Sequence, residues 1–293
     1  MSGRRAGNSG HNAAGLEIAL WDIIGKAAGL PLYKLLGAQT DRIPVYAATS
    51  RLLPGEELAE EVLSLMETGF KAVKLRLHRP DPRDDLAAVE AVRKAAGDDL
   101  LILVDCNQNN PSRAYRFWSR RTSLKMARAL EDLGVYVLEE PRPRQDIEGL
   151  AEIAAQVDML VAGGEHTPTV FDYKQHIQQR AFDVVQPDVV LGGNIGITGI
   201  RKVAELADYY GVQVIPHVLS NGARFPLCMA ATLHAMASVD NCPMVEYPYD
   251  PPILTPDNHQ AFVHEQILVE ADGCVQVPDQ PGLGITLRQE RLA

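Results

Sequence analysis

Short apolar runs alternate with amphipathic stretches along most of the chain. Eight of these runs have the length and composition of buried strands. They begin at Pro44, Phe70, Leu100, Val135, Met159, Phe182, Val212 and Pro243. Helical periodicity fills the spaces between them, as in residues 86–97 and 197–211. Strands recurring roughly every 25–35 residues have the spacing of βαβ units, so the pattern predicts an α/β fold, a (β/α)7β TIM-like barrel. A doubly wound open sheet is consistent with the same alternation.

The two ends of the chain depart from this alternation. Before the first strand, residues 15–37 have helical periodicity, with Leu16, Leu20, Ile23 and Ile24 on one helical face. After Pro248 an Asp-Gly turn between two short apolar runs predicts a hairpin outside the barrel. The pattern divides the chain into residues 1–42, a barrel over 43–249, and a C-terminal extension over 250–293.

The stretch from Asn107 to Ser123 is longer and more polar than the other predicted strand-to-helix loops. Long loops on this side of a barrel often shape a substrate pocket. A solvated, arginine-rich insertion fits the same residues equally well.

Composition limits the possible partners and compartments. A net charge of −10 argues against a nucleic-acid partner, which would need a basic face. No apolar run reaches the length of a membrane span, and the first residues lack the apolar core of a signal peptide. The 4 cysteines have no CxxC spacing, which favours a reducing compartment without structural zinc. We therefore expect a cytoplasmic protein with no membrane contact.

Polar residues occupy the ends of seven successive predicted strands, where barrel enzymes place their catalytic groups. They are Lys74, Arg76, Asp105, Asn107, Glu139, Glu165, Asp188, His217 and Glu246. Each has an ordinary alternative, since an acid after a strand often caps a helix and a lone histidine often sits in a core. The acids Asp105, Glu139 and Glu165 would converge in a barrel, and hard oxygen ligands suit Mg²⁺.

These strand ends carry motifs that resemble the enolase superfamily and, within it, the mandelate racemase-like subgroup. The resemblance runs from about Gly15 to the end of the chain. The matching motifs are ALWDIIGKAAGLPLYKLLG, KLR at Lys74, VDCNQ around Asp105, LEEP at Glu139, GGE at Glu165, QPDVVLGGNIGITG around Asp188, IPH at His217 and VEYP at Glu246.

The resemblance implies a role for each strand-end residue. It implies that Asp105, Glu139 and Glu165 bind one Mg²⁺ per chain, with Glu140 turned to the other face. His217 would be the general base, oriented by Asp188.

Other residues would handle the substrate, a small carboxylate. By the same resemblance, Lys74 would stabilise the enolate, Glu246 would hydrogen-bond the substrate carboxylate, and Asn107 would contact the substrate. His166 directly follows Glu165, and we interpret it as a loop residue rather than a ligand. The family often forms homo-oligomers, so we expect one here.

Two departures from the family pattern shape the expected activity. Arg76 stands where the racemase has a lysine that acts as a second base, and arginine, with a pKa above about 12, is a poor base. A single base favours a dehydratase acting on an acid sugar. A cycloisomerase or a racemase or epimerase on the same scaffold is the alternative. Residues 1–42 would be only the last helix and linker of the family's capping domain, which leaves an inactive barrel as a further alternative.

Overall fold

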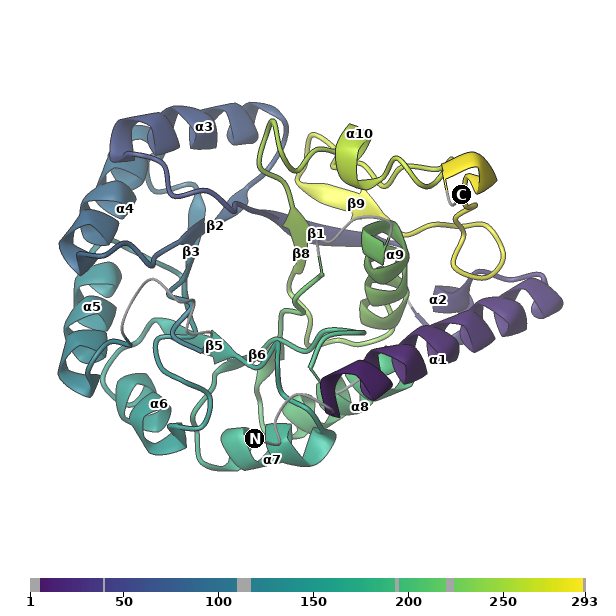
Figure 1. The fold of residues 1–293 in the computed structure, drawn as a ribbon, viewed down its shortest axis with the longest axis horizontal. Helices are drawn as coiled ribbons and strands as arrows, with labels where there is room; N and C mark the ends of the chain where they lie inside the picture. The colour runs from purple at the N-terminus through teal and green to yellow at the C-terminus, as the bar shows by residue number, and fades with distance from the viewer. Residues whose placement is uncertain (1–5, 39, 110–116, 193–194, 220–223, 292–293) are drawn as a thin grey trace.

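The computed structural model describes residues 6–38, 40–109, 117–192, 195–219 and 224–291. Within these ranges, eight parallel strands curl into a ring with helices around its outside (Figure 1). The strands are β1 (Arg42–Ala48), β2 (Ala72–Arg76), β3 (Leu101–Asp105), β4 (Val137–Glu139), β5 (Leu160–Gly163), β6 (Val184–Val185), β7 (Gln213–Val214) and β8 (Val245–Pro248). Each falls within or beside a predicted apolar run, so the strand predictions are confirmed.

The sheet has the neighbour order of a barrel. The order is β7-β6-β5-β4-β3-β2-β1-β8, and every pairing along it is parallel. Close to the ends of this path, the backbone N–H of Val214 in β7 donates to the carbonyl of Asn241, shortly before β8 (2.9 Å). The predicted α/β fold with a TIM-like barrel is confirmed.

Helices connect the strands and cover the outside of the ring. They are α3 (Gly55–Glu67), α4 (Pro82–Ala96), α5 (Arg120–Asp132), α6 (Ile147–Ala154), α7 (Val170–Gln178), α8 (Gly196–Tyr209) and α9 (Phe225–Met236). Each of the four helices α4 to α7 begins with a side chain that accepts a hydrogen bond from its first turn, which satisfies a free N–H group. These caps are Asp81, Ser119, Asp146 and Thr169.

The helix predictions for residues 86–97 and 197–211 are confirmed by α4 and α8. The predicted loop from Asn107 to Ser123 is wrong at its end, because α5 already begins at Arg120. Ser119 caps that helix through its side chain and thereby fixes its start. Residues 110–116 of the predicted loop lie outside the described residues.

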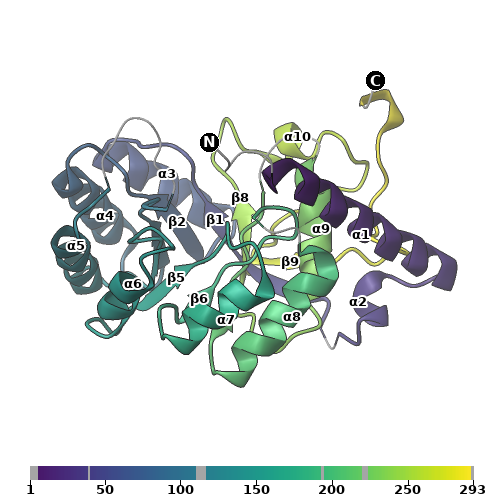
Figure 2. The same cartoon turned by 60° about the horizontal axis from the view of Figure 1, so that its bottom comes forward.

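The N-terminal helix α1 (Ala6–Ala28) lies on the outside of the barrel (Figure 2) and contacts α8. Ala14 and Ile18 are buried, and Gly29 ends the helix in the left-handed region (φ 68°). The short helix α2 (Leu32–Leu35) follows it. The apolar face predicted for α1 exists, but its side chains are exposed: Leu16, Leu20, Ile23 and Ile24 are 64%, 51%, 60% and 49% accessible.

The C-terminal extension was predicted as a hairpin, and this is only partly right. Val269 and Val275 form an isolated antiparallel bridge around the Asp-Gly turn. The second run, β9 (Cys274–Gln276), also pairs as an antiparallel strand with the first residues of β1, Arg42 to Pro44, and β8 pairs with β1 only from Val45 onward. These first residues have backbone groups that β8 does not pair, and β9 takes them up. The short helix α10 (Pro256–His259) lies in the same extension.

No helix among the described residues is long and apolar enough to cross a membrane. The division into residues 1–42, 43–249 and 250–293 remains a prediction.

Candidate functional site

The alternation of side chains along each strand places the polar groups inside the ring. Side chains alternate between the two faces of a strand, so the residue two positions after an inward core residue also points inward. In these strands that second residue is polar. In β2 the core residue Ala72 is followed by Lys74 and then Arg76, and in β3 Leu103 is followed by Asp105. The same spacing relates Val137 to Glu139, Val184 to Gln186, Ile215 to His217, and Met244 to Glu246.

Glu165 breaks this spacing, since it lies three residues after the inward Ala162. The chain turns at Gly164, which has φ +117°, a conformation that favours glycine. A Cβ atom at Gly164 would lie 2.8 Å from the ring of Tyr173. The glycine turn therefore lets the chain pass Tyr173 and brings the side chain of Glu165 back to the site.

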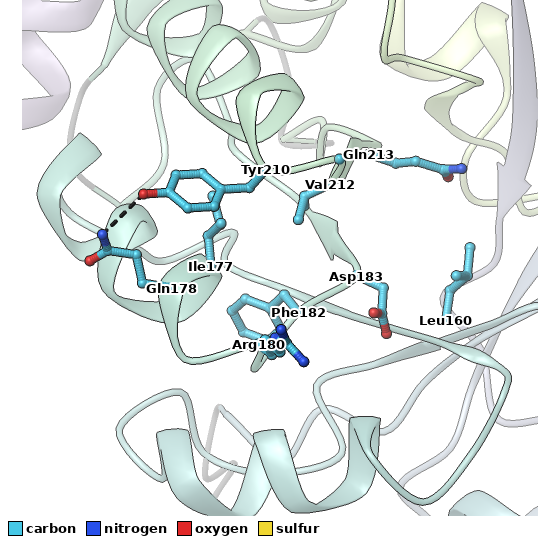
Figure 3. Close-up of a pocket in the computed structure, with 10 residues that line it drawn as sticks. Leu160, Ile177, Gln178, Arg180, Phe182, Asp183, Tyr210, Val212 and Gln213 are labelled. Carbon is cyan, nitrogen blue, oxygen red and sulfur yellow. Dashed lines mark hydrogen bonds between the residues drawn. The ribbon is translucent and has the colours of Figure 1, made fainter.

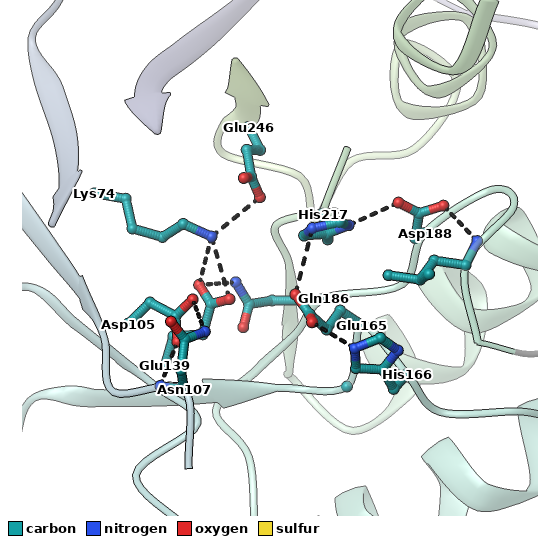
Figure 4. A network of polar contacts seen from close by, with 12 residues as sticks. Lys74, Asp105, Asn107, Glu139, Glu165, His166, Gln186, Asp188, His217 and Glu246 are labelled. Atoms are coloured by element: carbon teal, nitrogen blue, oxygen red, sulfur yellow. Dashed lines mark hydrogen bonds and ion pairs between the residues drawn. The ribbon is translucent and has the colours of Figure 1, made fainter. Parts of the chain in front are cut away.

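The amine of Lys74 lies at the centre of the site, fully buried (Figure 4). It donates to Oε2 of Glu139 (3.0 Å) and to Oε2 of Glu246 (3.1 Å). The hydroxyl of Tyr46 also donates to Glu246 (3.2 Å). Burial alone would lower the pKa of Lys74, but the two carboxylates outweigh it and raise that pKa. Lys74 is therefore a permanent cation.

Arg76 holds the carboxylate of Asp105. Its guanidinium donates to Oδ2 of Asp105 and, through Nε, to the carbonyl of Thr49 (2.9 Å). Asn107 donates to the same carboxylate twice, from its backbone N–H (2.8 Å) and from its side-chain amide (2.7 Å). Asn107 itself adopts φ +47°, which turns the chain back onto Asp105.

The imidazole of His217 bridges two carboxylates on the other side of the site. Its Nδ1 lies 2.7 Å from Oδ2 of Asp188, and its Nε2 lies 3.4 Å from Oε2 of Glu165. Burial alone would lower the pKa of His217, but the surrounding carboxylates, led by Glu165, raise it to about 10. His166, in the turn after β5, also contacts Glu165 through Nε2 (2.9 Å), so it is a neighbour of the site as well as a loop residue.

The residues predicted from the sequence thus lie in one cluster, and the cluster carries an excess of negative charge. The five carboxylates are Asp105, Glu139, Glu165, Asp188 and Glu246. Among the described residues, they face two permanent cations, Lys74 and Arg76, and two imidazoles, His166 and His217. Burial raises the pKa of Glu139 to about 7, against the lowering effect of Lys74. An under-compensated buried carboxylate of this kind takes up either a proton or a cation.

The three predicted metal ligands have the oxygen donors that suit a divalent cation, and two of them lie side by side in the barrel. Asp105 and Glu139 are register partners on β3 and β4, and Glu139 in turn pairs with Ala162 on β5. Among the described residues, however, no three such side chains are arranged as a ready set of metal ligands. Each carboxylate is instead held by a cation of the protein, Asp105 by Arg76 and Glu139 by Lys74. Glu165 likewise faces the two imidazoles.

One buried residue of the site was missed by the sequence predictions. Gln186 donates to Oε2 of Glu139 (2.7 Å), and it precedes Asp188 by two residues. That spacing could have identified it. Glu140, which was predicted to turn to the other face, adopts φ +47° and is 3% exposed, and neither of its carboxylate oxygens has a hydrogen-bond partner among the described residues. Burial raises the pKa of Glu140 well above its usual range.

One described cavity lies away from this cluster. It measures about 600 Å³ and is lined by residues at the N-terminal ends of the strands, including Leu160, Asp183 and Gln213 (Figure 3). Catalytic groups of barrels belong to the opposite face. The polar cluster, not this cavity, is the candidate active site.

An α/β barrel with acids, a lysine and a histidine–aspartate pair at its strand ends defines a class of barrel enzymes, and comparison with known proteins identifies the family. Residues 57–291 match the family model described as enolase C-terminal domain-like. Residues 3–37 match the N-terminal domain model of mandelate racemase and muconate lactonizing enzyme. The chain belongs to the enolase superfamily, in its mandelate racemase/muconate lactonizing enzyme branch.

The curated relatives include both dehydratases and isomerases. The chain is 32% identical to an L-talarate/galactarate dehydratase of Salmonella typhimurium, over 98% of this chain and 65% of the relative. It is also 32% identical to a 3,6-anhydro-alpha-L-galactonate cycloisomerase of Streptomyces coelicolor, over 98% of this chain and 73% of the relative. The chain thus spans about two thirds to three quarters of these proteins.

Solved structures agree with this assignment. A Streptomyces coelicolor racemase with bound magnesium is 32% identical with a TM-score of 0.84, covering 99% of this chain and 73% of that one. A Polaromonas L-talarate dehydratase, solved with Mg and L-glucarate, is 32% identical with a TM-score of 0.78, covering 93% and 69%. The relatives therefore include magnesium-bound proteins and one bound to a small carboxylate.

Proposed function

We propose that this protein removes the proton next to the carboxylate of a sugar acid and then expels water, giving a 2-keto-3-deoxy acid. The observation that carries the proposal is the placement of the His217–Asp188 pair opposite the buried amine of Lys74. Removing such a proton creates a doubly negative enediolate. A base on one side and a cation on the other are what this step requires.

Asp105, Glu139 and Glu165 would hold one Mg²⁺, in keeping with the charge excess of the cluster. Bound there, the metal would supply a Lewis acid that stabilises negative charge on the substrate carboxylate. Lys74 now contacts Glu139, and Arg76 contacts Asp105. Each of these carboxylates would then bind the metal and its neighbouring cation at the same time.

His217 acts as the general base in this proposal, which requires that a cation bound by Glu165 offset the charge that raises the pKa of the imidazole. The hydrogen bond from Nδ1 to Asp188 fixes the ring and leaves Nε2 directed at the site, 3.4 Å from Glu165. Asp188 is itself fixed, because its Oδ1 accepts from the backbone N–H groups of Val190 and Leu191, each at 2.7 Å. The base is therefore oriented before any substrate binds.

The remaining polar residues bind and stabilise the substrate. Lys74 would stabilise the charge that develops on the enediolate, because it is a buried and permanently charged amine. The carboxylate of Glu246 would accept hydrogen bonds from the bound acid, and the side-chain amide of Asn107 would donate to it or accept from it. Arg76 stays protonated, so it serves as a hydrogen-bond donor rather than a second base.

One base is sufficient for elimination. The imidazole nitrogen of His217 takes the α-proton, and the electrons of the broken C–H bond form the enediolate. When that collapses, the β-hydroxyl leaves with a proton from the same imidazole, so water and an enol are formed. The enol then becomes the 2-keto acid. No oxidant or second base is needed.

A cycloisomerase is the second candidate, because one of the relatives at 32% identity acts on an anhydro sugar acid. The same proton abstraction would there open a ring, and no water would be lost. Racemisation is disfavoured, since it needs an exchangeable proton on each face and Arg76 cannot supply one.

The test is to incubate the folded, Mg²⁺-loaded protein in D₂O with a panel of sugar acids and to follow the α-proton by NMR. We expect a 2-keto-3-deoxy product from at least one acid. Ring opening of an anhydro acid or a lactone without water loss would favour the cycloisomerase. Neither product nor α-deuterium exchange with any member of the panel would contradict the proposal. By resemblance, we also propose that the chain forms a homo-oligomer and that its three parts are those predicted from the sequence.

A further inference from the structure

Helix α8 follows directly after the segment that carries Asp188, and it is capped by a residue from another helix. Its N-cap position, Ile195, makes no side-chain hydrogen bond to the first turn. The carboxylate of Glu17 in α1 accepts instead from the backbone N–H groups of Ile197 and Thr198, both at 2.9 Å. Because the first N–H groups of a helix have no partner within it, Glu17 satisfies two of them.

The contact is close, and residues of both α1 and α8 contribute to it. Oε1 of Glu17 also accepts from the hydroxyl of Thr198 (2.6 Å) and from the indole N–H of Trp21 (2.8 Å). Gly196 has φ +57°, and a Cβ atom there would lie 2.2 Å from Oε2 of Glu17. Only glycine at position 196 allows the carboxylate to approach this closely.

A short path of hydrogen bonds leads from this cap to the candidate base. The backbone N–H of Gly196 donates to the carbonyl of Val189 (3.0 Å), so the start of α8 is tied to the residue after Asp188. Asp188 then holds the N–H groups of Val190 and Leu191 through one oxygen and His217 through the other.

We infer that Glu17 is a positioning residue for the His217–Asp188 pair. It fixes the start of α8, and through Gly196 and Val189 it fixes the carboxylate that orients the base. The expected effect on catalysis rests on the proposed function, whereas the expected effect on the geometry of the His217–Asp188 pair does not. Glu17 belongs to the region that matches the N-terminal domain model, so a residue outside the barrel helps to set the geometry inside it.

The same helix offers a matched control. Oδ1 of Asp22 accepts from the backbone N–H of Leu283 (2.9 Å), and a Cβ atom at Gly282 would lie 2.2 Å from that oxygen. This is the same kind of contact, from the same helix, to the C-terminal extension instead of to α8. A substitution at either residue should weaken the packing of α1 on the barrel. Only a substitution at Glu17 should disturb the geometry of the His217–Asp188 pair.

The experiment compares E17A, E17Q, G196A, the double variant E17A/G196A, and D22N with the wild type. The first readout is the low-field Nδ1–H resonance of His217 in histidine-labelled protein, assigned with H217N. We expect E17A to weaken or lose this resonance, E17Q to reduce it less because one acceptor remains, and D22N to keep it. G196A should have a smaller effect in the E17A background than alone, because the clash with the carboxylate is gone there.

The second readout is steady-state turnover of an active substrate. We expect E17A to lower kcat by about tenfold or more with KM little changed, since misplacing a catalytic group costs rate rather than binding. An unchanged His217 resonance in folded E17Q, or equal effects of D22N and E17A on it, would overturn the inference. If no sugar acid reacts with the wild type, the proposed function fails, and the resonance still decides the role of Glu17.

Discussion

The Nδ1 atom of His217 lies 2.7 Å from Oδ2 of Asp188, although 29 residues separate them in the sequence. This contact decides which nitrogen of the ring faces the site. Since Nδ1 is occupied by the carboxylate, Nε2 is the atom available for proton transfer.

Replacing His217 by asparagine should abolish α-proton exchange. The amide keeps a polar group of similar size but cannot take up a proton at neutral pH, so we expect a loss of about 10²–10⁴-fold or more. Exchange is measured by NMR in D₂O with an active sugar acid. Mg²⁺ affinity should stay close to that of the wild type. Exchange at an undiminished rate would show that another group is the base.

Replacing Asp105 by asparagine should weaken Mg²⁺ binding. Residues one shell away from a metal typically contribute about 10–100-fold to affinity, so the loss of a direct ligand should cost at least about 100-fold. Titration calorimetry of the metal-free protein measures this. D183N is the control, because Asp183 is a partly buried acid at the opposite end of the barrel. Equal losses in the two variants would argue against Asp105 as a ligand.

Replacing Arg76 by methionine should destabilise the protein more without Mg²⁺ than with it. The substitution leaves Asp105 buried without its guanidinium partner, and removing one member of a buried pair costs about 3–5 kcal/mol. A metal at Asp105 would replace the lost positive charge. The free energy of unfolding is measured in urea with excess EDTA and with saturating Mg²⁺. The same loss under both conditions would mean that no metal reaches Asp105.

The buried imidazole of His234 should make the protein less stable in mild acid. Its Nδ1 lies 3.1 Å from the backbone N–H of Tyr33, and its Nε2 lies 3.0 Å from the carbonyl of Leu283. Nδ1 therefore accepts, and the ring is neutral. Burial lowers the pKa of His234 from 6.5 to about 4.

The sign of the effect follows from that lowered pKa. The unfolded chain binds the proton more tightly, so the contribution is complete above pH 6.5 and is lost as the pH falls toward 4. It amounts to at most about 3 kcal/mol, from about 1.4 kcal/mol for each pH unit between the two pKa values. H234Q should show a flatter fall in unfolding free energy between pH 7.5 and 5 than the wild type. Parallel curves would refute this account.

Much of the site could be predicted because its signals are local. Lys74, Asp105, Glu139 and His217 each follow an apolar run at a strand end, and strand alternation alone directs them inward. Gln186 carried the same signal and was overlooked. The family resemblance also implied the contact between His217 and Asp188. The other side-chain contacts of these groups could not be predicted, because the partners come from different strands.

Contacts between distant segments could not be predicted from the sequence either. The pairing of β9 with the first residues of β1 joins residues more than two hundred positions apart and accompanies the partly formed hairpin. The cap that Glu17 places on α8 joins residues 180 positions apart. Neither contact produces a periodic or local pattern in the sequence.

The sequence by itself determined the order of the strands, the inward positions and the kinds of side chain at the mouth of the barrel. These follow from the two-residue repeat of a strand and from burial, which act over a few residues. Only the tertiary structure decided that Arg76 holds Asp105 and that Lys74 lies between Glu139 and Glu246. Those pairings arise when the ring brings the strand ends together, where a low-dielectric interior requires each buried charge to find a partner.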